Sequence, residues 1–218
     1  MRQVYEQYSE RRGFMIEAIN ISKSYHNKVI IDSFSTNIEK NSLTVITGQS
    51  GKGKTTLLNI LSMIEKPDNG VVRIDNIAEP DQKQLRDLRR YTLAYLFQNY
   101  GLVEEDTVER NLSISLTYRK NTKLAISEAL EKVGLSHYEK RKVYELSGGE
   151  QQRVALARVL LKDSSYIFAD EPTGNLDKDN RDVVIKLLRE MADNGKGVVL
   201  ATHDMELVPY ADQYICLS

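Results

Sequence analysis

The chain alternates between short apolar runs of strand length and longer segments in which apolar residues recur at helical spacing. This alternation predicts an α/β fold built around a mostly parallel sheet. We expect a first strand to open at residues 15–17, and further strands at 43–47, 71–75, 165–169, 197–202 and 213–217. We expect helices at residues 55–64 and 122–133, the second ended by Gly134, and another between the strands at 165–169 and 197–202.

The stretch from about residue 81 to residue 162 has a mainly helical pattern, and we interpret it as a helical subdomain inserted into the core. Residues 15–218 then form one domain that carries this insertion. The helix before strand 197–202 has an apolar stripe that we assign to core packing. The stripe consists of Val183, Val184, Leu187, Leu188 and Met191.

The first residues and the composition narrow the class of protein. Residues 1–13 are charged and lack the apolar stretch of a signal peptide, so we expect residues 1–14 to be a leader or an added extension without ordered structure. Apolar runs such as 166–169 and 198–201 are far too short to span a membrane. Cys216 is the only cysteine, which excludes an intrachain disulfide and suits a reducing cytoplasm. With 30 basic and 31 acidic residues, the chain offers no broad basic surface for nucleic acid.

A glycine-rich segment lies between the predicted strand at 43–47 and the helix at 55–64. Residues 48–55 read G-Q-S-G-K-G-K-T and match the phosphate-binding pattern G-x-x-x-x-G-K-T. Glycines let the backbone approach phosphates, and the following helix N-terminus presents N–H donors to them. Lys54 supplies a charge for the β- and γ-phosphates, and the hydroxyl of Thr55 suits Mg²⁺. By itself the motif would also fit a small kinase or a GTPase. The predicted nucleotide-binding residues of this segment are Gly48, Gln49, Ser50, Gly51, Lys52, Gly53, Lys54, Thr55 and Thr56.

Two carboxylates end the predicted strand at 165–169. In a parallel sheet the carboxyl ends of the strands line the ligand crevice. We therefore expect Asp170 near the metal and Glu171 near the γ-phosphate, where a carboxylate can deprotonate the attacking water.

The segment L-S-G-G-E-Q-Q-R at residues 146–153 has the features of a helix start. Ser147 and Glu150 form a predicted capping box. Gly148 and Gly149 leave the helix N-terminus uncovered, so that it could bind a second phosphate group. With the phosphate loop, this segment and the acidic strand in that order, the sequence resembles the ABC ATPase family over residues 15–218, and residues 146–153 are similar to its LSGGQ-type signature.

The resemblance implies a P-loop NTPase fold, with a RecA-like core, an antiparallel β subdomain and the inserted helical subdomain. It implies ATP and Mg²⁺ as ligands, and a head-to-tail dimer in which two copies enclose two ATP molecules. The catalytic residues that it implies are Glu171, His203 and Gln98, and the metal-binding residues are Thr55, Gln98 and Asp170. Tyr25 matches the aromatic residue that stacks on adenine, and Asp177 matches the loop that crosses the dimer interface. The residues implied to act on the partner's ATP are Ser147, Gly148, Gly149, Glu150 and Gln151.

Details of the motifs indicate a branch of the family. Lys52 replaces the small serine usual in this part of the phosphate loop. The segment E-P-T-G-N-L-D at residues 171–177 is typical of ATPases of lipoprotein release, macrolide efflux and bacteriocin export. Residues 95–100, Y-L-F-Q-N-Y, are similar to those of lactococcin-type bacteriocin exporters. The resemblance thus implies an exporter ATPase whose substrate is a peptide, a bacteriocin, a lipid-linked compound or a drug.

The implied partners are a second copy of the chain and integral membrane permease subunits, with no nucleic acid. We expect the chain to lie in the cytoplasm, peripherally on the inner face of the membrane, coupled to the permease through the region at 99–107 after Gln98. Two alternatives stay open: a mechanotransmitting ATPase that regulates a cell-wall hydrolase, and a short importer ATPase. DNA-repair ATPases of the family have coiled coils or zinc insertions between the phosphate loop and the signature, whereas this chain has one compact insertion there. Translation factors of the family have two cassettes, whereas this chain has one.

Overall fold

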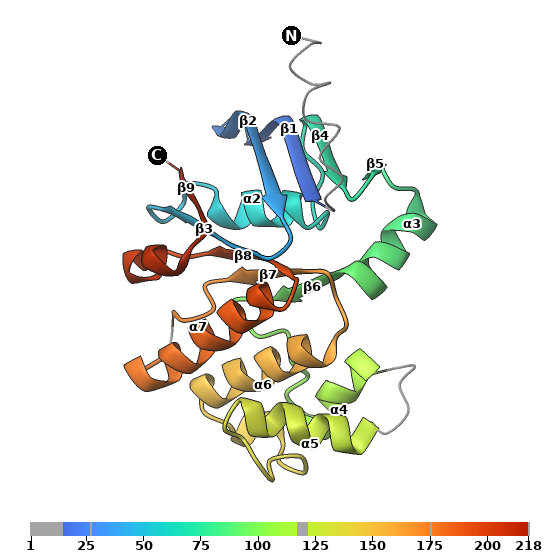
Figure 1. Cartoon of the computed structure of the whole chain (residues 1–218), viewed down its shortest axis with the longest axis vertical. Coiled ribbons are helices and arrows are strands. Elements are labelled where there is room, and N and C mark those ends of the chain that lie inside the picture. The colour runs from blue at the N-terminus through green and yellow to red at the C-terminus, as the bar shows by residue number, and fades with distance from the viewer. Residues whose placement is uncertain (1–14, 27, 117–121, 175, 218) are drawn as a thin grey trace.

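The computed structural model describes residues 15–26, 28–116, 122–174 and 176–217, so the expected extension at residues 1–14 lies outside the described part of the chain. The described residues form two sheets and the helices packed on them (Figure 1). The strands are β1 Met15–Tyr25, β2 Lys28–Glu39, β3 Ser42–Gly48, β4 Asn69–Ile74, β5 Ile77–Ala78, β6 Leu93–Leu96, β7 Tyr166–Asp170, β8 Gly197–Ala201 and β9 Gln213–Leu217. The α-helices are α2 Lys54–Leu61, α3 Gln82–Asp87, α4 Val108–Ser113, α5 Thr122–Lys132, α6 Gly148–Leu161 and α7 Lys178–Asp193. Shorter helical turns are η1 Leu88–Thr92, η2 Ile114–Leu116, η3 Val143–Glu145 and η4 Met205–Tyr210.

The larger sheet has the order β6-β7-β8-β3-β9, and all of its strand pairs are parallel. The smaller sheet has the order β2-β1-β4-β5 and is antiparallel. The predicted α/β class is therefore confirmed. In the large sheet Asp170 of β7 pairs with Ala201 of β8, which pairs with Ile46 of β3. This register brings the carboxyl ends of three strands to one edge.

Alternate residues of the parallel strands contribute to two separate cores. Ile167 and Ala169 of β7 face the core formed with α4, α5, α6 and α7. Tyr166 and Phe168 of the same strand face a second core, formed with α2 and the antiparallel sheet. Because side chains alternate along a strand, each buried strand serves both layers. In Figure 1, α2 lies between the two sheets, and α6 and α7 lie on the other face of the parallel sheet.

The range 81–162, which we expected to be mainly helical, also contains a strand. Residues Leu93–Leu96 form β6, which pairs with β7 at the edge of the parallel sheet. A four-residue apolar run cannot be distinguished from a helical segment by periodicity alone. We propose that the helical subdomain begins after this strand.

Two smaller predictions were also wrong. The helix predicted to reach residue 64 ends at Leu61, because the chain turns at Met63, whose φ is 55°. In the apolar stripe of α7, Val183 is 39% exposed and Ile185 is buried instead. The other four residues of the stripe are buried as predicted.

Candidate functional site

The phosphate loop, residues 48–53, connects β3 to α2, which is the predicted strand, turn and helix. Gly51 and Gly53 have φ values of 77° and 91°, in the left-handed region that favours glycine. A Cβ atom at Gly53 would lie 2.6 Å from Cγ2 of Ile30. Glycine is therefore required at position 53 both by the backbone angle and by the space available.

Lys54 is the first residue of α2 and is only 8% exposed. Its ammonium donates hydrogen bonds to the carbonyl oxygens of Gly48, at 2.8 Å, and Gln49, at 3.3 Å. The loop therefore holds the ammonium against its own backbone, where phosphate oxygens can replace the two carbonyls as stronger, charged acceptors.

The remaining predicted loop residues lie around this ammonium. Gln49, Ser50 and Lys52 are exposed. The backbone N–H of Lys52 donates to the carbonyl of Gln49 at 3.2 Å, which closes the turn. Among the described residues, the Lys52 side chain has no hydrogen-bonding or ionic partner, so its charge is available at the rim of the loop.

Thr55 and Asp170 meet across two neighbouring elements. The Thr55 hydroxyl, in the first turn of α2, donates to Oδ1 of Asp170 at the end of β7, at 3.1 Å. Burial raises the pKa of the Asp170 carboxyl, while the Thr55 hydrogen bond and the nearby Lys54 charge oppose that effect. A buried carboxylate beside a single ammonium is a site that favours an additional cation.

The donors present suit Mg²⁺. A hydroxyl and a carboxylate are the hard oxygen ligands that this ion prefers. Within the described ranges, no group of three or more His, Cys, Asp or Glu side chains could hold a metal alone. An ion bound by few protein ligands fits Mg²⁺, which takes its other ligands from substrate phosphates and water.

Glu171 is held by contacts to Thr202 and His203. Its Oε2 accepts from the Thr202 hydroxyl at 3.2 Å and from the His203 backbone N–H at 3.4 Å, and it lies 3.0 Å from Nδ1 of the His203 ring. Its φ is 47°, a left-handed angle that is uncommon for a residue with a side chain. Such an angle persists only where the surrounding structure enforces it, and it frequently marks a functional position.

The structure adds Thr202, which the sequence analysis did not single out. This residue is fully buried, and its hydroxyl also accepts from the Asp204 backbone N–H at 3.0 Å. Its position just before His203 was the available signal, because both residues follow β8, whose end adjoins the end of β7. His203 itself is exposed, so its second ring nitrogen can reach a ligand.

Tyr25 and Gln98 are on the periphery of this arrangement. Tyr25 ends β1 and is 40% exposed. Gln98 lies in an exposed turn directly after β6. In the described part of the chain, Gln98 makes no hydrogen bond to Thr55 or Asp170, so the structure does not bring these two predicted metal ligands into contact with it.

The predicted signature starts α6. Ser147 is the N-cap, and its hydroxyl accepts from the Glu150 N–H at 3.3 Å, while Oε2 of Glu150 accepts from the Ser147 N–H at 2.8 Å. The capping box is thus confirmed, and these bonds lower the pKa of Glu150. Gln151 donates from Nε2 to the carbonyl of Leu146 at 3.1 Å. A Cβ at Gly148 or Gly149 would come within 3.2–3.3 Å of a neighbouring side chain, so both positions favour glycine.

The signature and the phosphate loop of one chain are on opposite faces of the parallel sheet. Helix α6 packs in the core with α5 and α7, whereas α2 packs in the core below the antiparallel sheet (Figure 1). The sheet therefore separates the α6 N-terminus from the α2 N-terminus of the same chain.

The loop after β7 is attached to the signature helix. Gln152 of α6 is buried, and its Nε2 donates to the carbonyl of Pro172 at 2.9 Å. Arg153 donates to the side-chain oxygen of Asn180, and the Asn180 amide donates to Asp177 at 2.7 Å. Asp177 is the N-cap of α7, and its bonds to Asn180 lower its pKa. Asn175 of the predicted dimer loop is outside the described residues.

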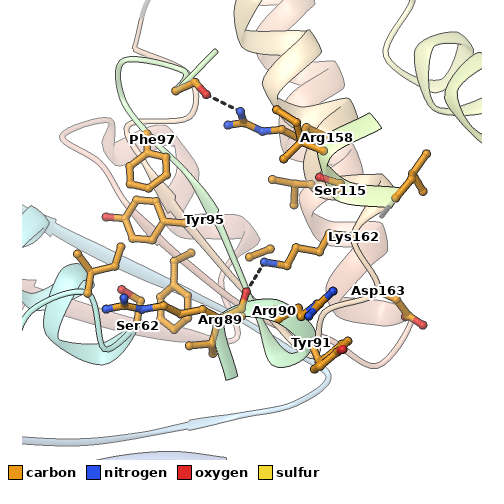
Figure 2. A pocket seen from close by; sticks show the side chains of 18 residues that line it. Ser62, Arg89, Arg90, Tyr91, Tyr95, Phe97, Ser115, Arg158, Lys162 and Asp163 are labelled. Atoms are coloured by element: carbon orange, nitrogen blue, oxygen red, sulfur yellow. Dashed lines mark hydrogen bonds between the residues drawn. The ribbon is translucent and has the colours of Figure 1, made fainter. Parts of the chain in front are cut away.

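A groove of about 520 Å³ lies between the edge strand β6 of the parallel sheet and the segments η2 and α6 (Figure 2). One wall comes from η1 and β6 and includes the stacked rings of Tyr95 and Phe97, whose centroids are 4.4 Å apart. The other wall comes from η2 and α6, where Arg158 donates to the backbone of Tyr100 and Gly101. The two walls are bridged by Lys162, whose ammonium donates to the carbonyl of Arg89 at 2.6 Å.

Comparison with known proteins agrees with this geometry. The family model described as ABC transporter matches residues 31–174. The macrolide export ATP-binding/permease protein MacB of Hyphomonas neptunium is 39% identical over 194 residues, which are 85% of this chain and 30% of that protein. The dimeric structure of MJ0796, a bacterial ABC transporter cassette, has a TM-score of 0.86 at 32% identity and covers 93% of this chain and 94% of that one. A post-hydrolysis dimer of the same cassette, bound to ADP and Pi, has a TM-score of 0.86 at 31% identity over the same shares of the two chains.

Proposed function

Because the chain belongs to the ABC transporter family of ATP-binding cassettes, we propose that it is the ATP-hydrolysing subunit of an ABC exporter. The observation that carries this proposal is the placement of Glu171. Its carboxylate is held by Thr202 and His203 beside the hydrogen-bonded pair of Thr55 and Asp170. This is the place where a base acting on water next to a bound phosphate is needed.

In the proposed reaction, Lys54 and the first N–H groups of α2 bind the β- and γ-phosphates. Thr55 and Asp170 would hold Mg²⁺, and the ion would supply positive charge to the phosphate oxygens. Glu171 accepts a proton from the attacking water while the oxygen of that water forms a bond to the γ-phosphorus. The bond from that phosphorus to the bridging oxygen breaks, and ADP and phosphate leave. His203 keeps Glu171 oriented through Nδ1, and its other ring nitrogen faces the γ-phosphate.

The active form that we propose is a head-to-tail dimer. The signature residues 147–151 lie across the sheet from the phosphate loop of their own chain, so they complete the site of a second copy. The structural neighbour MJ0796 is dimeric in its solved structures, one of them bound to ADP and Pi. ATP then bonds both copies, and loss of the γ-phosphate removes the bonds that favour the closed dimer.

The permease partner is inferred from the relatives. The MacB proteins are named as joint ATP-binding and permease proteins, and the chain spans about 30% of their length. In the part of the chain that the structure describes, no helix is long and apolar enough to cross a bilayer. We therefore propose that a separate or attached permease supplies the membrane spans and holds this domain on the cytoplasmic face of the membrane.

The groove of Figure 2 is where we expect the permease to dock. It joins the core to the helical subdomain and lies beside the residues after Gln98, so a segment bound in it contacts both parts at once. Its lining combines four aromatic residues, of which Tyr91 and Phe97 are exposed, with four basic residues, a composition typical of protein interfaces. The aromatic and basic residues of the lining are Tyr91, Tyr95, Phe97, Phe168, Arg89, Arg90, Arg158 and Lys162.

Glu171→Gln tests the proposed activity. The amide cannot accept the proton, so turnover should fall about 10²- to 10⁴-fold while ATP binding is retained. Size-exclusion chromatography should show a dimer with ATP but a monomer with ADP. Adding Gly148→Asp should prevent this dimer without affecting ATP binding, because it places a negative charge where the partner's phosphate is expected. Near-normal turnover of Glu171→Gln would contradict the proposal.

A further inference from the structure

The adenine-stacking candidate Tyr25 is tied to a carboxylate. Its hydroxyl donates a hydrogen bond to Oε1 of Glu65. Glu65 follows the end of α2, the helix that starts at the phosphate loop. Burial, and next the Glu65 hydrogen bond, raise the pKa of Tyr25, so the phenol stays a donor at neutral pH. The ring is therefore linked to the same element that carries Lys54 and Thr55.

Glu65 is in turn fixed by a small network. The ammonium of Lys23 lies 3.1 Å from Oε1 of Glu65 and donates to Oδ1 of Asp68 at 3.0 Å and to the Lys66 carbonyl at 2.9 Å. The other oxygen of Asp68 accepts from the Ser24 N–H at 2.8 Å. The segment after α2 is thus fastened to the end of β1 by side chains on both sides. The Lys23 side chain is only 13% exposed, whereas the side chains of Glu65 and Asp68 are 26% and 43% exposed, so Lys23 is the best-shielded member of this network.

The same lysine limits which face of the Tyr25 ring a ligand can contact. Its ammonium lies 5.6 Å from the centroid of the Tyr25 ring, within the range of a cation–π contact. A cation over one face leaves the other face for a planar ligand. The ring is 40% exposed, which is enough for a base to stack on it.

We propose that Glu65 is a positioning residue for the base of the nucleotide. By holding the hydroxyl of Tyr25, it fixes the ring in the orientation that stacks on adenine before the nucleotide arrives. Immobilising the ring in advance removes an ordering cost from binding. This inference rests on the proposed function, and it assigns Glu65 an effect on the adenine alone and none on the phosphates.

The test compares binding of Mg-ATP with binding of magnesium tripolyphosphate, which lacks the base, by calorimetry. For Glu65→Ala we expect ATP affinity to fall about three- to tenfold and tripolyphosphate affinity to stay unchanged. Glu65→Gln keeps an acceptor oxygen and should restore ATP affinity to within about twofold of the original. The matched control is Glu128→Ala, which removes an exposed carboxylate of α5 that has no hydrogen-bonding or ionic partner among the described residues.

A double-mutant cycle isolates the hydrogen bond. Tyr25→Phe keeps the ring but loses the hydroxyl, so it should weaken ATP binding as Glu65→Ala does. The double variant should be no weaker than either single variant, because both remove the same interaction. If Glu65→Ala unfolds the domain, Tyr25→Phe still tests the bond, since the Lys23 network is left intact.

Three results would overturn the inference. Unchanged ATP affinity in Glu65→Ala and Tyr25→Phe would show that the bond does not position the ring. An equal loss of tripolyphosphate affinity would place the effect on the phosphate loop, and tighter ATP binding would show that the network holds the ring away from the base. If the unmodified chain bound neither ligand, the proposed function itself would fail, and this outcome is distinct from the other three.

Discussion

At Asp170, the proposed function of the site as a metal ligand conflicts with the stability of the folded domain. The carboxyl is nearly buried at the end of β7, and burial raises its pKa above the ordinary value of 3.8. The folded state without nucleotide therefore holds a proton on Asp170 more tightly than the unfolded chain does. At pH values above the raised pKa, ionised Asp170 lowers the free energy of unfolding, and the penalty disappears below pH 3.8.

Asp170→Asn should therefore stabilise the nucleotide-free domain at neutral pH. The gain in melting temperature over the original chain should shrink as the pH is lowered toward 3.8, because the native carboxyl, whose pKa is raised by burial, takes up its proton before the unfolded chain does. Thermal unfolding of both proteins at each pH measures this gain in melting temperature. The variant should also lose the stabilisation that Mg-ATP gives, since a metal ligand is gone. No gain at neutral pH would show that burial of Asp170 is not a cost to folding.

The residues that the sequence did not predict are those that act through other residues. The phosphate loop, Asp170, Glu171 and the signature are contiguous motifs whose residue types indicate their chemistry. Thr202, Gln152 and Glu65 matter through hydrogen bonds to positions 20 to 40 residues away in the chain, at Glu171, Pro172 and Tyr25. Such pairs depend on the tertiary fold, so no local pattern reveals them.

At the level of elements, the strong turn and capping signals predicted the ends of helices most accurately. The signature helix starts at its predicted capping box, and α5 ends before Gly134, whose φ is 69°. Strand β6 was missed because its four apolar residues lie between helical segments, and only pairing with β7 makes them a strand. Local chemistry determined the ends of these helices, whereas sheet membership depended on a distant partner.

The capping residues provide a test at this scale. Ser147→Ala should lower the free energy of unfolding by about 1 kcal/mol, because the N-cap bond to Glu150 is lost. Thr107→Ala removes the equivalent cap of α4, where the hydroxyl accepts from Arg110 at 3.2 Å, and should cost a similar amount. Denaturant unfolding measures both.

Measurements of ATPase activity distinguish the roles of the two N-cap residues, Ser147 and Thr107. We expect only Ser147→Ala to lose activity beyond its effect on stability, because only α6 meets the partner's nucleotide in the proposed dimer. Equal losses of activity in the two variants would indicate that Ser147 acts through stability alone.

For the whole molecule, the motifs predicted the family and the α/β architecture, but the transported substrate has no trace in this domain. The chain covers only about 30% of the MacB relatives. What the domain does contain is the groove where we propose that a permease docks. The groove between core and helical subdomain presents Tyr91, which is 57% exposed, at its rim.

Tyr91→Asp should disrupt this coupling surface. When the tagged chain is purified from its native membranes, we expect recovery of the permease to fall at least about tenfold, since buried tyrosines dominate many interfaces. Leu124→Asp on α5, at a position 61% exposed and outside the groove, is the matched control and should leave recovery unchanged. Recovery that survives Tyr91→Asp would place the docking surface elsewhere. A solute-binding protein among the recovered partners would indicate an importer.

The order of the parallel sheet also determines when the site can first exist. Strand β8 lies between β7 and β3, and residues 197–201 that form it are synthesised after both of these strands. Until then, β7 and β3 lack the strand that joins them in the sheet, and both have unpaired edges. A growing chain must therefore remain without a complete nucleotide site, and at risk of aggregation, until β8 has been synthesised. Nucleotide cannot assist the early steps of folding, and it can only stabilise a sheet that is already complete.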